Sequence, residues 1–217
     1  MPLNTKTITY SLVAAVATGV ATSQSGSSIT LNGSLVTAGV ATLDSGGAAR
    51  RLIISSGGND TGITFKITGT DRYGRAQSES LAGASGAAAQ SVKDYLTVSS
   101  IVPSGAVATY VTAGTNGVGS SAPMIVDWVP NGNLMKCSTL ITGTVNYTIQ
   151  EAIDDLAPAW DLTTNNPNWF ADPVFNAVTG NMTGNLSGPF TMVRVLINSG
   201  TGSVQTKFIT PFIGGAI

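Results

Sequence analysis

Acidic side chains gather in one stretch of the sequence, and they are the first candidates for chemistry. Glu151, Asp154, Asp155 and Asp161 offer the oxygen ligands that Ca²⁺ prefers, but without the glycine-punctuated alternation of a dedicated calcium loop. Glycoside hydrolysis needs two carboxyl groups across a cleft, and the chain has only two glutamates, Glu79 and Glu151. Both occupy strand positions where a solvated, outward side chain suffices. The pattern favours a solvated loop or a subunit contact and predicts neither a metal nor a catalytic site.

Aromatic side chains follow these acids. Trp160, Trp169 and Phe170 lie in an irregular stretch, 155–173, that is also rich in asparagine. Aromatic rings beside amides are typical of sugar-binding sites, and tryptophan is also enriched where proteins bind each other. A third interpretation is that the rings cap a hydrophobic core. All three remain open from the sequence, so Trp160, Trp169 and Phe170 are candidate interface or glycan contacts.

Residue types that carry much of enzyme chemistry are rare. The chain has no histidine, which excludes Ser-His-Asp and Cys-His catalysis and histidine-ligated metals. Cys137 is the only cysteine, so disulfides within the chain and cysteine-cluster zinc sites are excluded too. It lies in an apolar stretch and is expected to be a small buried side chain. We therefore expect no enzymatic activity and no cofactor.

Charge is sparse. Charged residues make up 10% of the chain and the net charge is −1, whereas nucleic-acid binding requires clustered lysine and arginine. Arg50-Arg51, the only adjacent basic pair, is interpreted as a solvated strand end. The apolar run 12–21 is too short to span a membrane. Neither nucleic acid nor a membrane is an expected partner.

Strand patterns dominate the first half. Residues 63–68 alternate so that Ile63, Phe65 and Ile67 share one face, which predicts a half-buried strand. A turn at 71–74 and a returning strand at 76–81 complete a predicted hairpin. Residues 96–102 and 106–112 are predicted to form a further pair.

The second half shows the same period. Val145, Tyr147 and Ile149 are predicted to share a buried face, and 192–198 with 204–209 to form a closing hairpin. The Gly/Ser-rich stretch 113–123 is the best linker candidate. The predicted fold is all-β, with two small β-sandwich or barrel-like domains in tandem at 1–120 and 121–217.

Several of these strand-and-turn segments resemble a type of small virion-associated protein of tailed bacteriophages. They are SGGNDTGITFKITGTDRYGRAQSESLAG (56–83), DYLTVSSI (94–101), GTNGVGSS (114–121), TGTVNYTIQEAIDD (142–155) and VRVLINSGTGSVQ (193–205). In such proteins a Gly-Asn-Asp turn leads into a strand that ends in Thr-Gly-Thr-Asp. These are strand-and-turn patterns without a catalytic signature.

The resemblance implies a homo-oligomeric structural component of the virion, a head-decoration or head–tail collar protein acting by self-assembly and surface contact. Its partners would be other copies of itself and phage capsid, portal or tail proteins. The alternative is a carbohydrate-binding adhesin module for host attachment, and only then is a host glycan a partner.

The N-terminal arm, residues 2–21, is expected to extend along, or add a strand to, a neighbouring copy or partner protein. The alternative is that it forms the first strand of its own sandwich.

Overall fold

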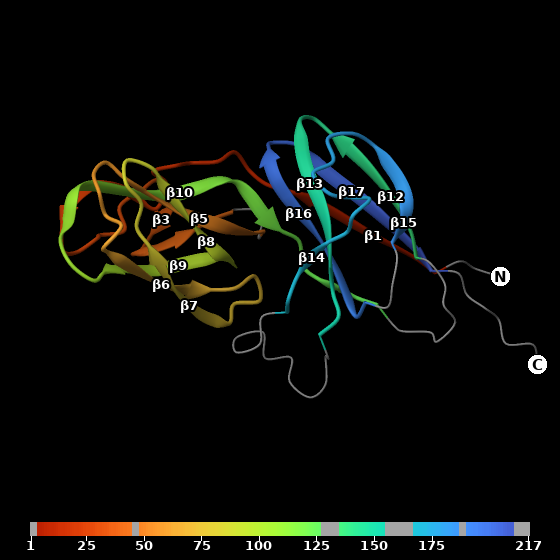
Figure 1. The fold of residues 1–217 in the computed structure, drawn as a ribbon, viewed down its shortest axis with the longest axis horizontal. Helices are drawn as coiled ribbons and strands as arrows, with labels where there is room; N and C mark the ends of the chain where they lie inside the picture. The colour runs from red at the N-terminus through yellow and green to blue at the C-terminus, as the bar shows by residue number, and fades with distance from the viewer. Residues whose placement is uncertain (1–3, 45–47, 127–134, 155–166, 187–189, 211–217) are drawn as a thin grey trace, which may run out of the picture. The chain divides into compact units, whose positions relative to one another are not determined.

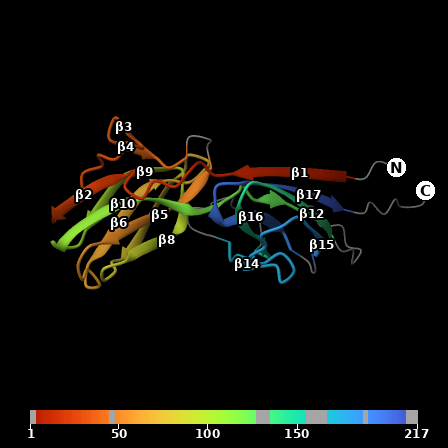
Figure 2. The ribbon, with the colours of Figure 1, turned by 90° about the horizontal axis from the view of Figure 1, so that it is seen from above.

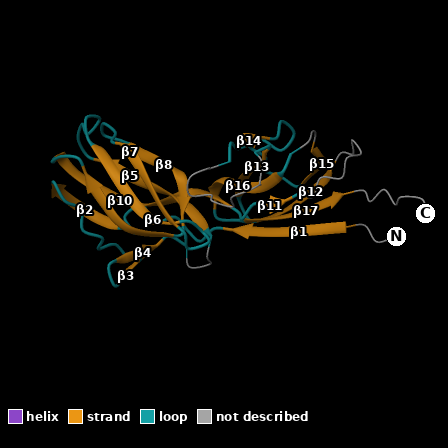
Figure 3. Ribbon diagram, turned by 90° about the horizontal axis from the view of Figure 1, so that it is seen from below, coloured by secondary structure: helices purple, strands orange, loops and turns teal. Residues whose placement is uncertain are grey.

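The computed structural model describes residues 4–44, 48–126, 135–154, 167–186 and 190–210. All regular secondary structure within these ranges consists of β-strands (Figure 3), which confirms the all-β prediction. The chain divides into two compact units. The first unit comprises residues 12–120, and the second comprises residues 1–11 together with 121–217.

The first unit contains the strands coloured orange to green in Figure 1. They are β2 (Ala21–Gly26), β3 (Val36–Thr37), β4 (Val40–Thr42), β5 (Ala49–Ser56), β6 (Thr64–Thr70), β7 (Ala76–Ala82), β8 (Ala88–Tyr95), β9 (Thr97–Pro103) and β10 (Val107–Ser120). One sheet has the order β3-β4-β9-β6-β7. In the other, β5 lies between β10 and β8, and β2 also pairs with β10.

The core of the first unit lies between these two sheets. Phe65 and Ile67 of β6 are fully buried together with Leu52 and Ile54 of β5, as the alternation in both strands requires. The predicted hairpin of β6 and β7 is confirmed, in unbroken register from Thr64 opposite Ala82 to Thr70 opposite Ala76. The predicted pairing of 96–102 with 106–112 is wrong. The turn after Pro103 carries the chain from one sheet to the other, so β9 pairs with β4 and β6 while β10 pairs with β2 and β5.

The interpretation of the Gly/Ser-rich stretch 113–123 as a linker is wrong for most of its length. Residues up to Ser120 belong to β10, and Ala113 and Thr115 are buried. Small residues are needed here because the chain at Val16 and Ala17 passes directly over Gly114, where a Cβ atom would overlap the Val16 carbonyl oxygen. Close backbone approach produces the same composition as a flexible linker.

The interpretation of Arg50-Arg51 as a solvated strand end is also wrong. Arg50 is only 1% exposed, and its guanidinium lies 3.7 Å from the Asp44 carboxylate. It donates hydrogen bonds to the carbonyl groups of Val13 (2.8 Å) and Asn116. Arg51 forms an ion pair with Asp94 at 3.1 Å. Both arginines therefore tie strands and loops of the first unit together.

The second unit contains the strands β1 (Asn4–Ser11), β11 (Met124–Ile125), β12 (Met135–Thr142), β13 (Val145–Ala152), β14 (Phe170–Ala171), β15 (Met182–Leu186), β16 (Met192–Gly200) and β17 (Ser203–Thr210). One sheet has the order β1-β17-β12-β15. On the other side of the interior, β13 lies between β14 and β16, and β11 pairs with β16. Tyr147 of β13 hydrogen-bonds Thr139 of β12 across this interior.

The alternation in 144–150 correctly predicted the buried face, because Val145, Tyr147 and Ile149 all lie in the core. Cys137 is buried as expected, and burial raises the pKa of its thiol to about 12. The closing hairpin of 192–198 with 204–209 is wrong. The turn at 199–202 links strands of opposite sheets, so β16 pairs with β13 and β17 pairs with β1 and β12.

The N-terminal segment is divided between the two units. β1 pairs with β17 of the same chain, from Asn4 opposite Thr210 to Ser11 opposite Ser203 (Figure 2). Leu12 and Val20 are buried within the first unit. Within one chain, the described part of the arm, residues 4–21, is therefore not an unpaired extension. The first unit differs from the predicted segment 1–120 because residues 4–11 complete a sheet formed by the C-terminal half.

Candidate interface or glycan surface

Trp169 lies over the outward face of β13 and β16. The Arg194 guanidinium of β16 stacks on its ring, 4.2 Å from the ring centre, and Arg194 Nε donates to Gln150 Oε1 of β13 at 2.8 Å. A stacked guanidinium orients the ring and covers one of its faces. The sequence did not point to Arg194, which is distant along the chain, although it and Gln150 occupy the polar positions of their alternating strands.

Phe170 follows immediately and belongs to β14, opposite Glu151. Its side chain is 59% exposed. It does not cap a core; it is an apolar ring offered to solvent beside Trp169. Trp160, the third predicted aromatic, lies outside the described residues.

A row of polar side chains continues along the same outward face. Asn198 Nδ2 donates to Asn146 Oδ1 at 2.7 Å and to Thr148 Oγ1 at 2.9 Å. Thr148 in turn contacts Asn176 Oδ1 at 3.4 Å and accepts the N–H of Ala177 at 3.0 Å. These are the alternate positions to the buried Val145, Tyr147 and Ile149. The face thus combines uncharged hydrogen-bonding groups with an aromatic ring and an arginine.

The acidic residues separate into different environments. Asp154 accepts hydrogen bonds from the backbone N–H (2.8 Å) and side-chain amide (3.3 Å) of Asn168. These bonds fix the position of the residue that precedes Trp169. Glu151, by contrast, interacts with Asp172 through charge and a side-chain hydrogen bond. Asp155 and Asp161 lie outside the described residues. Among the residues described, no group of three or more potential metal ligands comes together.

Neither glutamate is the simple solvated side chain that the sequence suggested. Glu79 of β7 accepts the backbone N–H groups of Val92 (2.7 Å) and Lys93 (2.9 Å), so it satisfies part of the edge of β8. Glu151 is half-buried, and burial, the charge of Asp172 and a hydrogen bond with it raise the pKa of Glu151 to about 7. The sequence does not show that these two carboxyl groups have partners, because the partners lie on other segments that only the fold brings close.

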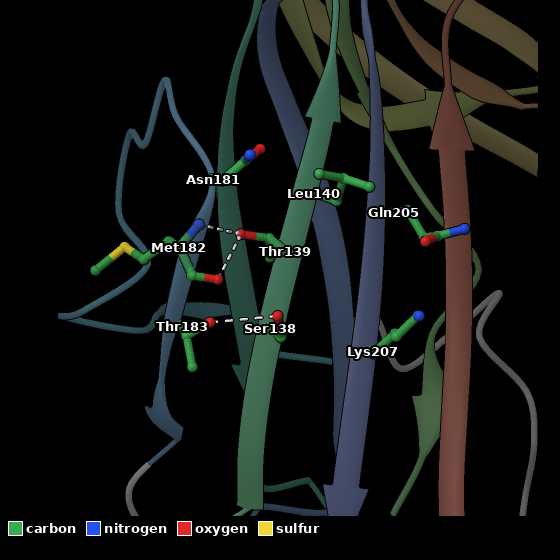
Figure 4. A pocket seen from close by; sticks show the side chains of 8 residues that line it. All are labelled: Ser138, Thr139, Leu140, Asn181, Met182, Thr183, Gln205 and Lys207. Carbon is green, nitrogen blue, oxygen red and sulfur yellow. Dashed lines mark hydrogen bonds between the residues drawn. The ribbon is translucent and has the colours of Figure 1, made fainter.

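A second surface lies on the outward face of β15, β12 and β17, where side chains line an open groove of about 400 Å³ (Figure 4). On the outward face Thr183 Oγ1 donates to Ser138 Oγ at 3.3 Å. From the buried face of β12, Thr139 Oγ1 accepts the N–H of Met182 and donates to its carbonyl, both at 3.2 Å. Leu140 is 53% exposed in the groove, and among the described residues that line it Lys207 is the one with a charge.

Strand register extends this surface across the whole sheet. One cross-strand row contains Thr7, Lys207, Ser138 and Thr183, and the next contains Thr9, Gln205 and Leu140. Hydroxyl and amide groups cost less free energy to remove from water than charged groups do, and Leu140 adds an apolar side chain to them. The face can therefore be covered by another protein surface. It was not predicted from the sequence.

No family model, curated protein or solved structure matches this chain. Among the described residues, no helix is long and apolar enough to cross a membrane.

Proposed function

We propose that this chain is a structural component of a tailed-phage virion, a homo-oligomeric head-decoration or head–tail collar protein. The resemblance of its strand-and-turn segments to small virion-associated phage proteins suggests this class of protein. The observation that carries the mechanism is the outward face of β1, β17, β12 and β15, formed largely by threonine, serine and glutamine side chains around Leu140. Charged residues are depleted at the centres of protein interfaces, and the described lining of the groove around Leu140 contains one charged residue, Lys207.

In this proposal the protein acts by self-assembly and contact, without catalysis, cofactor, nucleic acid or membrane. Copies would bury the face around Leu140 and pair backbone at β1 and β15, the outer strands of that sheet. The partners are other copies and phage capsid, portal or tail proteins, and the location is the virion. We further propose that the two compact units are two separately folding β-sandwich or barrel-like domains.

Leu140→Lys tests the contact face, because it places a charge at its centre. The variant should keep its β-sheet circular dichroism but shift from oligomer towards monomer in size-exclusion chromatography with light scattering. Val102→Lys is the matched control, since Val102 of β9 is similarly exposed (55%) in the first unit. Assembly that survives Leu140→Lys, or that only Val102→Lys disrupts, would show that this face is not the contact.

The alternative, a carbohydrate-binding adhesin module, is favoured by one observation, the grouping of Trp169, Phe170 and Arg194 beside the amides of β13 and β16. Trp169→Ala should then abolish retention on a glycan array while leaving the β-sheet signal unchanged. Tyr110→Ala, which removes an exposed ring of the first unit, should leave retention intact. Absence of any glycan retention by the natural chain would rule the alternative out.

A further inference from the structure

Two carboxyl groups meet inside the second unit. Gln150 of β13 pairs with Ala171 of β14, and the N–H of the next residue, Asp172, donates to the Ile149 carbonyl at 2.9 Å. Side chains alternate along a strand, so the Glu151 side chain lies on the same face of β13 as Ile149. The Ile149 side chain is fully buried. The pairing brings Asp172 beside both, and Asp172 is only 1% exposed.

One oxygen of each carboxyl group is left without a conventional partner. Asp172 Oδ1 accepts the N–H groups of Val174 and Phe175, both at 2.8 Å, which fixes the turn after β14. Asp172 Oδ2 and Glu151 Oε1 are buried and, apart from each other's carboxyl group, have no hydrogen-bond partner among the described residues. If both groups were ionised, the half-buried Glu151 and the buried Asp172 would place two like charges side by side, which is costly unless a proton lies between them.

Within the described part of the chain, the titratable groups near the pair bring no positive charge to it. Cys137 of β12 and the Tyr147 hydroxyl of β13 face the same interior, and burial raises the pKa of both. Asp154 is engaged with Asn168, and Arg194 contacts Gln150 and Trp169 on the outward face. Burial comes first among the causes that raise the pKa of Glu151 from 4.5 to about 7, followed by the Asp172 charge and the hydrogen bond between them.

We propose that Glu151 holds a proton and shares it with Asp172, and that this bond is a pH-sensitive latch attaching segment 167–178 to β13. When the proton is lost, two like charges repel across the contact, which weakens the attachment of the segment beside the two-residue strand β14. Backbone bonds to β13, the Asp154–Asn168 bonds and the Arg194–Trp169 contact still hold it, so the effect is a local loosening. The segment carries Trp169 and Phe170, so the latch controls how firmly the aromatic surface is held. This inference does not depend on the proposed function.

The absence of histidine makes the proton directly observable, because no imidazole titrates in the same range. Carbon-13 NMR of carboxyl-labelled protein in chelator-containing buffer should show one glutamate with a midpoint near 7. Glu151→Gln should remove that signal, and Asp172→Asn should move the midpoint of Glu151 back towards 4.5. A natural chain in which every carboxyl group titrates below pH 6 would overturn the proposal without any variant.

The attachment itself is tested by hydrogen exchange, with rates corrected for intrinsic pH dependence. Amides of 167–178 should lose protection between pH 6 and pH 8 in the natural chain, while amides of β6 serve as the internal control. In Glu151→Gln the amide still bridges to Asp172 but cannot ionise, so protection should not depend on pH. Equal pH dependence in the two proteins would overturn the latch even if the shared proton were observed.

Discussion

Arg50→Met removes the buried guanidinium of the first unit while retaining a long side chain. Asp44, also 1% exposed, would be left as a buried carboxylate without the neighbouring Arg50 charge, while it still accepts the Val13 N–H at 3.1 Å. The carbonyl groups of Val13 and Asn116 would lose a donor. Breaking a buried ion pair from one side typically costs about 3–5 kcal/mol, and we expect a loss in that range.

Urea unfolding measures this loss, with two spectroscopic signals. All three tryptophans lie after residue 120, so their fluorescence reports on the second unit, whereas far-ultraviolet circular dichroism reports on both. If the units fold separately, Arg50→Met should lower the dichroism midpoint and leave the fluorescence midpoint in place.

Arg75→Met is the control, because Arg75 pairs with Asp71 at 2.8 Å at a partly exposed site, where such pairs are worth about 0.2–1 kcal/mol. Adding Asp44→Asn to Arg50→Met should recover part of the loss. The reasoning would be refuted if Arg50→Met cost no more than Arg75→Met.

Two further predictions concern the backbone and the acid pair. Gly114→Ala should destabilise the first unit by about 1–3 kcal/mol, since the new methyl group overlaps the Val16 carbonyl, whereas Gly62→Ala, with open space around it, should cost little; equal losses in urea unfolding would contradict this. Because folding raises the pKa of Glu151 from 4.5 to about 7, the folded state binds the extra proton, so its free energy of unfolding should fall as pH rises through that window. The full shift corresponds to about 3 kcal/mol, which partial exposure of the carboxyl group reduces to about 1–2 kcal/mol. Glu151→Gln should lack this component, and identical pH profiles for both proteins would refute it.

Local patterns in the sequence predicted local features correctly. Two-residue alternation identified the buried faces containing Phe65 and Ile67 and, in the second unit, Tyr147 and Ile149. The β6–β7 hairpin was predictable because its turn, at 71–75, is held by short-range bonds of Asp71.

Relations between distant segments were not predictable. Alternation is the same whether a turn returns a strand beside its predecessor or carries it to the opposite sheet, so the pairings of β9, β10, β16 and β17 were missed. Arg50 looked solvated because nothing near it in the sequence shows that Asp44 becomes its partner. At the candidate site, the stacking of Arg194 on Trp169 and the coupling of Glu151 to Asp172 likewise arise only when separate strands meet.

The most direct test of the proposed function is a symmetric reconstruction and quantitative mass spectrometry of virions from a phage that encodes this chain. The proposal predicts dozens to hundreds of copies per particle, arranged symmetrically on the head or the collar, with the face around Leu140 covered by a neighbouring subunit. Absence of the chain from the particle would contradict the proposal. A handful of copies at the tail tip, with Trp169 and Phe170 facing outward, would contradict the assembly role and favour the adhesin.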